Sequence, residues 1–80
     1  MLRSMNTPDN AGAVALRAWL KGRSMTPTGF ARENNFHARS VLGWMRGENM
    51  PRIDAAADIE RITEGAVPVL AWAERTVRRG

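Results

Sequence analysis

The sequence contains no cysteine and a single histidine, His37, among its 80 residues. Without thiols, neither a disulfide framework nor a thiolate metal site can form, so the chain has no need of an oxidising compartment. A lone histidine without thiolate or carboxylate companions is a poor basis for a metal site. The composition therefore predicts no metal and no cofactor.

Long apolar runs and catalytic motifs are also missing. No stretch approaches the ~18 apolar residues of a membrane span, and the first ten residues, MLRSMNTPDN, lack the apolar centre of a signal peptide. The chain has neither a GxGxxG nor a GxxxxGK phosphate loop, and its one histidine offers no Ser/His/Asp set. We therefore expect a cytoplasmic protein that is not an enzyme and has no membrane partner.

Positive charge is concentrated in the first part of the chain. Residues 1–52 carry eight basic and three acidic side chains, whereas residues 53–80 carry four basic and five acidic ones, for a net charge of +4. This distribution places the attraction for a polyanion on the amino-terminal part. Arginine outnumbers lysine eleven to one, which suits phosphate and guanine contacts, although the codon bias of a GC-rich genome would give the same ratio.

Residues 26–47 predict two short capped helices joined by a tight turn. Thr26 can cap the first helix through its hydroxyl, and Pro27 fits the first helical position, where no N–H is needed. Asn35 tolerates the left-handed backbone of a turn, and Gly47 can end the second helix in the same conformation. Two short helices in this arrangement are the format of a DNA-reading helix-turn-helix.

The remaining chain predicts three further helices. One begins near Asp9 or Asn10 and runs to about Lys21 with Gly22 as its cap, and another runs from about Ile53 to Glu64 and ends at Gly65. Pro68 can open the last helix. We expect a flexible tail over residues 1–8, a DNA-binding domain over 9–65 and a carboxy-terminal helix over 66–80. The fold class is therefore all-α, a compact five-helix bundle.

A set of residues in the middle of the chain resembles the DNA-binding domains of phage and prophage repressors of the Cro/CI-like (YdaS/Cro-like) type. The residues that carry the resemblance are Ala31, Asn35, Phe36, Val41, Trp44, Arg46, Gly47, Glu48 and Pro51, of which Ala31, Val41 and the run from Trp44 to Pro51 match the family pattern. Asn35 stands where that family usually has glycine. The resemblance covers roughly residues 14–64. It implies a lambda repressor-like fold and a sequence-specific transcriptional repressor, phage-encoded or bacterial, that acts as a homodimer on an inverted repeat of double-stranded DNA.

The second helix of the motif is expected to enter the major groove with its amino-terminal end. The candidate base contacts are Ala38, Arg39, Ser40, Leu42 and Gly43. Arg39 can give two hydrogen bonds to a guanine, and Ala38 can touch a thymine methyl. The alternative for Arg39 is a contact to phosphate.

Residues flanking the two motif helices are the candidate phosphate contacts. These are Thr26, Thr28, His37, Arg46, Asn49 and Arg52. His37 has three interpretations at this point: an imperfect helix cap, a phosphate contact, or a metal ligand. By the resemblance, Arg52 approaches the DNA backbone near the dimer axis.

The carboxy-terminal helix has two apolar stripes and is the candidate dimer interface. Its candidate residues are Val69, Leu70, Trp72, Ala73 and Val77. The alternatives are that Trp72 and Leu70 fold back onto helices of the same chain, or that the segment GAVPV pairs as a strand across a dimer. A different class of function also stays open, an antitoxin or protein-interaction module whose last helix binds a partner protein.

Overall fold

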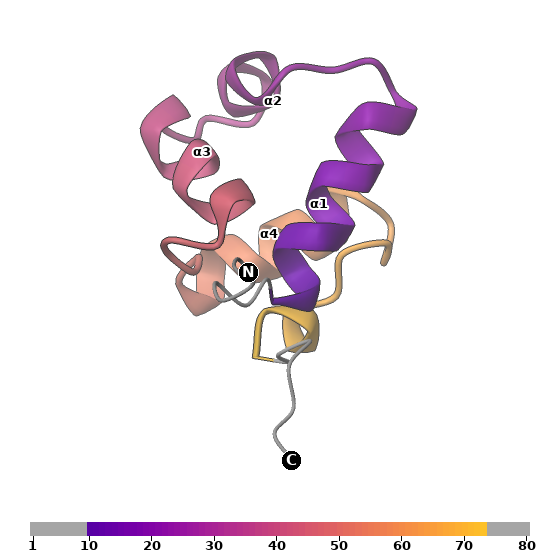
Figure 1. The fold of residues 1–80 in the computed structure, drawn as a ribbon, viewed down its shortest axis with the longest axis vertical. Helices are drawn as coiled ribbons and strands as arrows, with labels where there is room; N and C mark the ends of the chain where they lie inside the picture. The colour runs from indigo at the N-terminus through magenta and orange to yellow at the C-terminus, as the bar shows by residue number, and fades with distance from the viewer. Residues whose placement is uncertain (1–9, 74–80) are drawn as a thin grey trace, which may run out of the picture.

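The computed structural model describes residues 10–73. They form four α-helices, α1 (Ala11–Gly22), α2 (Pro27–Glu33), α3 (Ala38–Arg46) and α4 (Ile53–Ile62), and a short 3-10 helix, η2 (Val69–Ala73). Figure 1 shows α1 and α3 facing each other across the molecule, with α2 at one end and α4 and η2 at the other. No strand occurs in residues 10–73, so the all-α prediction is confirmed and the GAVPV segment forms no strand.

Several expectations lie at the ends of the chain. The predicted flexible tail over residues 1–8 falls outside the described residues. Of the helix predicted for 66–80, the described part contains only η2. None of the helices within residues 10–73 is both long and apolar enough to cross a membrane.

Helix α1 begins where it was predicted but ends differently. Asn10 is the N-cap, and its side-chain oxygen accepts a 2.7 Å hydrogen bond from the Ala13 N–H. The predicted cap at Gly22 is wrong, because Gly22 is the last helical residue and Ser24 takes the left-handed conformation (φ 53°). The Met25 N–H then reaches back to the Leu20 carbonyl at 2.9 Å. This closing bond is that of a Schellman motif, and Met25 packs against the core just after it.

The predicted signals for α2 and α3 are confirmed. The Thr26 hydroxyl accepts a 3.0 Å hydrogen bond from the Gly29 N–H, and Pro27 is the first residue of α2. Asn35 adopts the left-handed conformation (φ 62°) in the turn, and Gly47 does so after α3 (φ 76°). The turn is closed by a 2.9 Å bond from the Phe36 N–H to the Ala31 carbonyl. These bonds hold α2 and α3 at a defined angle.

The core is organised around a row of four aromatic rings. Trp19 packs edge-on against Phe30 with ring centroids 5.9 Å apart, and Phe30 lies 6.0 Å from Phe36. Phe36 in turn meets Trp44 edge-on at 5.3 Å. Phe30 is completely buried in the middle of this row. The row joins α1, α2 and α3, and it sets the position of α3 relative to the rest of the molecule.

Helix α4 ends two residues before the predicted Glu64, and the chain returns along its flank. Ala56 and Ile59 are buried, and Gly65, the predicted helix end, has the left-handed conformation (φ 88°). The buried Thr63 hydroxyl donates to the Ile59 carbonyl (2.7 Å) and accepts from the Val67 N–H (3.1 Å). This hydroxyl therefore fixes the loop that leads into η2.

Trp72 of η2 packs against α1 of the same chain. Its side chain is 4 % exposed, and its ring lies so close to Gly12 that a Cβ at position 12 would overlap it. The sequence left two alternatives for Trp72, a dimer interface or packing onto a helix of the same chain. This contact shows the second, because Trp72 packs on α1. Its buried Nε1 has no hydrogen-bond partner among residues 10–73.

Candidate nucleic-acid interface

Helix α3 is anchored to the body on its inner side. Val41 and Trp44 are buried, and Met45 packs partly against the core. The guanidinium of Arg17, on α1, donates a 2.6 Å hydrogen bond to the Met45 carbonyl in the last turn of α3. A cation at the carboxyl end of a helix also interacts favourably with the helix dipole. Helix α3 is thus held at a fixed position with its opposite side directed outward.

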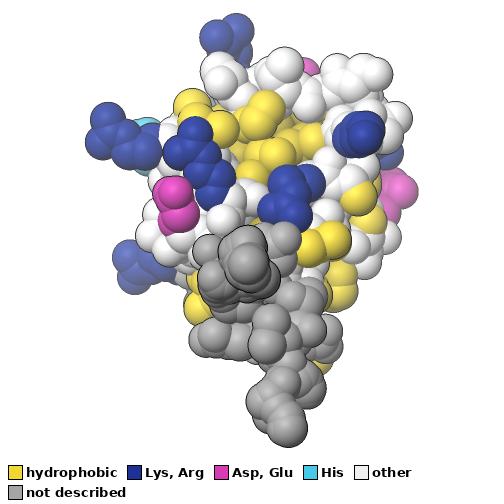
Figure 2. Space-filling model, viewed as in Figure 1, with side chains coloured by type: hydrophobic (Ala, Val, Ile, Leu, Met, Phe, Trp, Pro, Cys, Tyr) yellow, Lys and Arg dark blue, Asp and Glu magenta, His cyan; other side chains and the backbone are white. Residues whose placement is uncertain are grey.

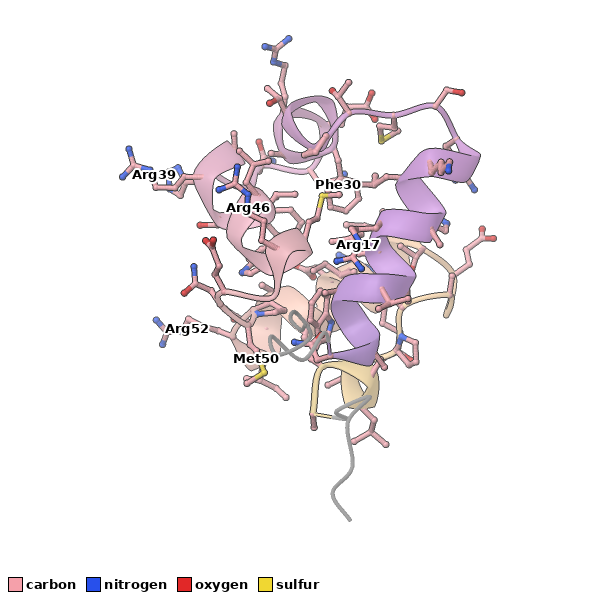
Figure 3. All side chains as sticks on the ribbon, in the orientation of Figure 1. Arg17, Phe30, Arg39, Arg46, Met50 and Arg52 are labelled. Atoms are coloured by element: carbon pink, nitrogen blue, oxygen red, sulfur yellow. The ribbon has the colours of Figure 1, made fainter. Side chains whose placement is uncertain are left out.

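The outward side of α3 carries arginine. Arg39 and Arg46 are exposed, and Leu42 between them is half-buried. Arg52, in the loop before α4, is also exposed. Figure 3 shows the guanidinium groups of Arg39 and Arg52 pointing away from the body on the α3 side of the molecule and that of Arg46 in front of α3, whereas Arg17 points from α1 towards α3. Figure 2 shows basic side chains on this side and also at the top, in the centre and at the opposite edge of the same view. Glu48 is exposed in the loop between Arg46 and Arg52.

The other candidate base contacts are less exposed than Arg39. Ala38 and Ser40 are half-buried. Gly43, a candidate base contact that would have to be exposed, is buried, and the Asn49 amide lies 2.5 Å from where its Cβ would stand. After the left-handed turn at Gly47, the chain folds back and its N–H groups at 48 and 49 bond the Gly43 carbonyl. The accessible part of α3 therefore centres on Arg39, Leu42 and Arg46.

The amino end of α3 is open. His37 occupies the N-cap position, yet its side chain makes no capping hydrogen bond. The side chains at 37–40 line a depression there. Backbone N–H groups of an uncapped first turn, at the positive end of the helix dipole, are a suitable site for a phosphate. His37 is thus the N-cap residue of α3 by position, although its side chain makes no capping hydrogen bond.

The candidate phosphate contacts fall into two groups. Thr26 and Thr28 are exposed at the start of α2, where the Thr26 hydroxyl already accepts a bond from Gly29. Arg46, Asn49 and Arg52 are exposed at the far end of α3 and in the following loop. His37 lies between these groups along the chain. No three His, Asp or Glu side chains within residues 10–73 are grouped so that they could hold a metal ion.

The candidate dimer residues differ in their exposure to solvent. Leu70 is 73 % exposed and Ala73 is exposed, while Val69 is half-buried and Trp72 is covered by α1. Val77 lies outside the described residues. Two exposed apolar side chains that local sequence patterns do not single out, Met50 and Ile53, join Leu70 around a cavity of about 270 Å³ lined entirely by apolar residues. The apolar surface defined by Met50, Ile53 and Leu70 is called the apolar patch below.

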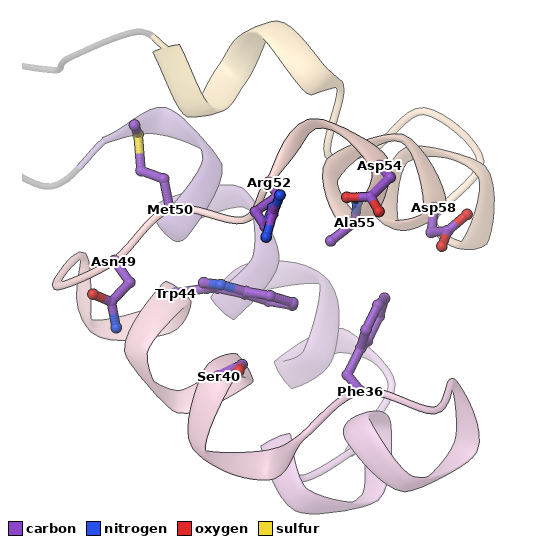
Figure 4. A pocket seen from close by; sticks show the side chains of 9 residues that line it. All are labelled: Phe36, Ser40, Trp44, Asn49, Met50, Arg52, Asp54, Ala55 and Asp58. Carbon is purple, nitrogen blue, oxygen red and sulfur yellow. The ribbon is translucent and has the colours of Figure 1, made fainter.

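A second, larger cavity separates α3 from α4. It has a volume of about 560 Å³ and is lined by aromatic, charged and polar side chains from both helices and the loop between them. Figure 4 shows the rings of Phe36 and Trp44 between Ser40 of α3 and the two carboxylates of α4, Asp54 and Asp58. No local sequence pattern indicates this cavity, because its two walls come from different helices.

Comparison with known proteins identifies no relative for this chain. No protein-family model matches the sequence, no curated protein matches it, and no solved structure matches the fold.

Proposed function

We propose that the protein is a sequence-specific regulator of transcription that binds double-stranded DNA, with α2 and α3 as a helix-turn-helix and α3 as its reading helix. The observation that carries the proposal is the orientation of α3. Its apolar side is packed and anchored by Arg17, while Arg39 and Arg46 are left exposed on its outer side. A rigid helix with an exposed cationic face has the dimensions and the charge to enter the major groove.

Arg39 is the proposed base-reading residue. It lies in the first turn of α3, which is the part of a reading helix nearest the base edges, and its guanidinium can donate two hydrogen bonds to a guanine. Ala38 and Ser40 flank it and can contact a methyl group or a polar base edge. Leu42 offers no hydrogen bond, and Gly43 is buried. Recognition by direct contacts is therefore sparse, and DNA shape supplies the remaining selectivity.

Phosphate contacts on both sides of α3 would position the helix. At its amino end, the free N–H groups of α3, His37 and the threonines of α2 would face the phosphates of one DNA strand. At its carboxyl end, Arg46, Asn49 and Arg52 would face the phosphates of the second DNA strand. Such contacts fix the orientation of a protein on DNA and make its affinity depend on salt.

We further propose that the active form is a homodimer that pairs through the apolar patch and binds an inverted repeat as a repressor in the bacterial cytoplasm or nucleoid. Three of the four large hydrophobic side chains exposed within residues 10–73 belong to this patch, and its cavity is lined by no charged residue. Two copies of a chain with net charge +4 meet with the least repulsion at an uncharged surface. A two-fold pair would present two copies of α3 to half-sites about one helical turn apart, near ~34 Å.

The same patch supports a second candidate function. An uncharged apolar surface on a small domain can also bind a different protein, as in an antitoxin or another protein-interaction module in which DNA binding is secondary. Gel shift with the DNA upstream of the gene, combined with size-exclusion chromatography and light scattering, separates the two functions. The regulator is expected to be a dimer that shifts this DNA at low salt. A monomer that shifts no DNA would contradict the regulator and favour the interaction module.

Replacing Arg39 is expected to change which sequence the protein prefers. Arg39→Ala should weaken binding to the best operator by about 1–3 kcal/mol and relax the preference at one base pair, because one bidentate guanine contact is lost. The measurement is fluorescence anisotropy with the operator and with single-base variants of it.

Lys21→Ala is the matched control, since it removes one exposed positive charge from the end of α1. It should leave the base preference intact. If Arg39→Ala weakens binding to all sequences equally, Arg39 contacts phosphate and does not read a base.

A further inference from the structure

The cavity between α3 and α4 holds opposite charges that do not pair with each other. Arg52 lies on one side of it and Asp54 and Asp58 lie on the other. Within the described part of the chain the only ion pair joins Asp58 Oδ1 to Arg61 at 2.8 Å. Asp54 Oδ1 accepts a 2.8 Å bond from the Ala55 N–H. The second oxygen of each carboxylate and the whole guanidinium of Arg52 are thus available to a ligand.

The cavity also has an aromatic floor. Phe36 and Trp44 meet edge-on beneath it, and Figure 4 shows Arg52 on the side of Trp44 that faces α4. Ser40 adds a hydroxyl from α3. A volume of about 560 Å³ lies in the range of small-molecule sites, which combine an apolar lining with a few polar groups that orient the ligand.

We propose that this cavity binds a zwitterionic α-amino acid with an aromatic side chain. The carboxylate of the ligand takes two hydrogen bonds from Arg52, which is the geometry that a guanidinium favours. The ammonium group lies against the free oxygens of Asp54 and Asp58. The aromatic side chain packs on Phe36 and Trp44, where offset or edge-on ring contacts are favourable. Each of the three parts of the ligand therefore meets a complementary group of the cavity. A simple acid, a simple amine or a hydrocarbon would leave some of these groups without a partner.

The position of the cavity suggests that its ligand affects DNA binding, and this part of the inference rests on the proposed function. Helix α3 packs chiefly against α1 and α2, whereas α4 packs against η2, so a ligand here would bridge two helices that have little direct contact. Arg52 is also a proposed phosphate contact. A carboxylate that holds Arg52 competes with the DNA backbone, so the amino acid acts as an inducer that weakens DNA binding, and DNA weakens ligand binding by the same factor.

Ligand binding is tested first without DNA. Isothermal titration calorimetry with phenylalanine at millimolar concentrations should give saturable binding to one site. Phenethylamine and 3-phenylpropionate, which each lack one of the two charges, should bind about tenfold or more weakly, because each loses a charge-assisted hydrogen bond. Absence of saturable binding, or equal binding of the three compounds, would overturn the proposal.

Variants then assign the binding to the cavity. Arg52→Gln and Asp54→Asn should each reduce phenylalanine affinity about tenfold or more while the melting temperature is retained. Arg46→Gln and Glu33→Gln are matched controls for phenylalanine binding, because they neutralise exposed charges that do not line the cavity, and both should bind phenylalanine with wild-type affinity. If the controls lose as much affinity as the cavity variants, the site lies elsewhere.

The effect on DNA is measured separately. Phenylalanine that saturates the wild type should lower operator affinity of the wild type about fivefold or more, and the same concentration should lower that of Asp54→Asn by less. If phenylalanine binds but operator affinity does not change, the site stands and its role as an inducer site is wrong. If the protein binds no DNA, the calorimetry still decides whether the amino-acid site exists.

Discussion

Phe30→Ala is expected to abolish most of the stability of the fold. Phe30 is completely buried and touches the rings of Trp19 and Phe36, so its removal leaves a cavity where α1, α2 and α3 meet. Truncation of a buried phenylalanine costs about 3–5 kcal/mol, which is a large part of the roughly 5–15 kcal/mol that holds a domain folded. The melting temperature followed by circular dichroism should fall by roughly 12 °C or more.

Two further variants show whether that loss comes from the core. Phe30→Leu keeps most of the apolar volume and should cost less than about 1.5 kcal/mol. Val14→Ala changes a side chain that is 41 % exposed and should stay within about 0.5 kcal/mol of the wild type. If Phe30→Ala melts with the wild type, the aromatic row does not hold α3 in place.

Gly12→Ala and Gly22→Ala are expected to change stability in opposite directions, although both glycines lie in α1. Alanine is usually better than glycine in a helix by about 0.5–1 kcal/mol. A Cβ at position 22 meets nothing within 4 Å, so Gly22→Ala should be neutral or stabilising. A Cβ at position 12 overlaps the buried ring of Trp72, so Gly12→Ala should cost about 1–3 kcal/mol through overpacking.

Urea unfolding of the two glycine variants measures this difference directly. Trp72→Gly in the Gly12→Ala background removes the ring that causes the overlap. In that background the alanine should no longer be destabilising relative to glycine, because the two effects are coupled through one contact. Equal stability of Gly12→Ala and Gly22→Ala would show that η2 does not pack on α1.

Signals that act within a few residues predicted the local structure well. The cap at Thr26, the turn at Asn35 and the helix end at Gly47 are each set by the conformation or hydrogen bond of one residue, and each is found in the structure. Gly22 was misjudged for a related reason. Left-handed helix ends usually fall at glycine, but here Ser24 takes that conformation and Met25 packs against the core just after it, which glycine spacing does not reveal.

Contacts between distant parts of the chain were not predictable from helical spacing. The burial of Gly43 depends on the loop that folds back and brings Asn49 over it. The bond from Arg17 to the Met45 carbonyl spans 28 residues. The candidate site shows the same division: the exposed position of Arg39 follows from the pattern of α3, whereas the apolar patch and the α3–α4 cavity depend on how the helices pack.

The most direct test of the proposed function is to map the DNA-binding surface by NMR. Amide chemical shifts of the ¹⁵N-labelled protein would be followed while a duplex of the DNA upstream of its gene is added at low salt. We expect the largest changes in residues 37–46, with further changes at the start of α2 and around Arg52, and smaller ones in α1 and η2. Absence of any change with DNA, or changes centred on α1 or η2, would contradict the proposal that α3 is the reading helix.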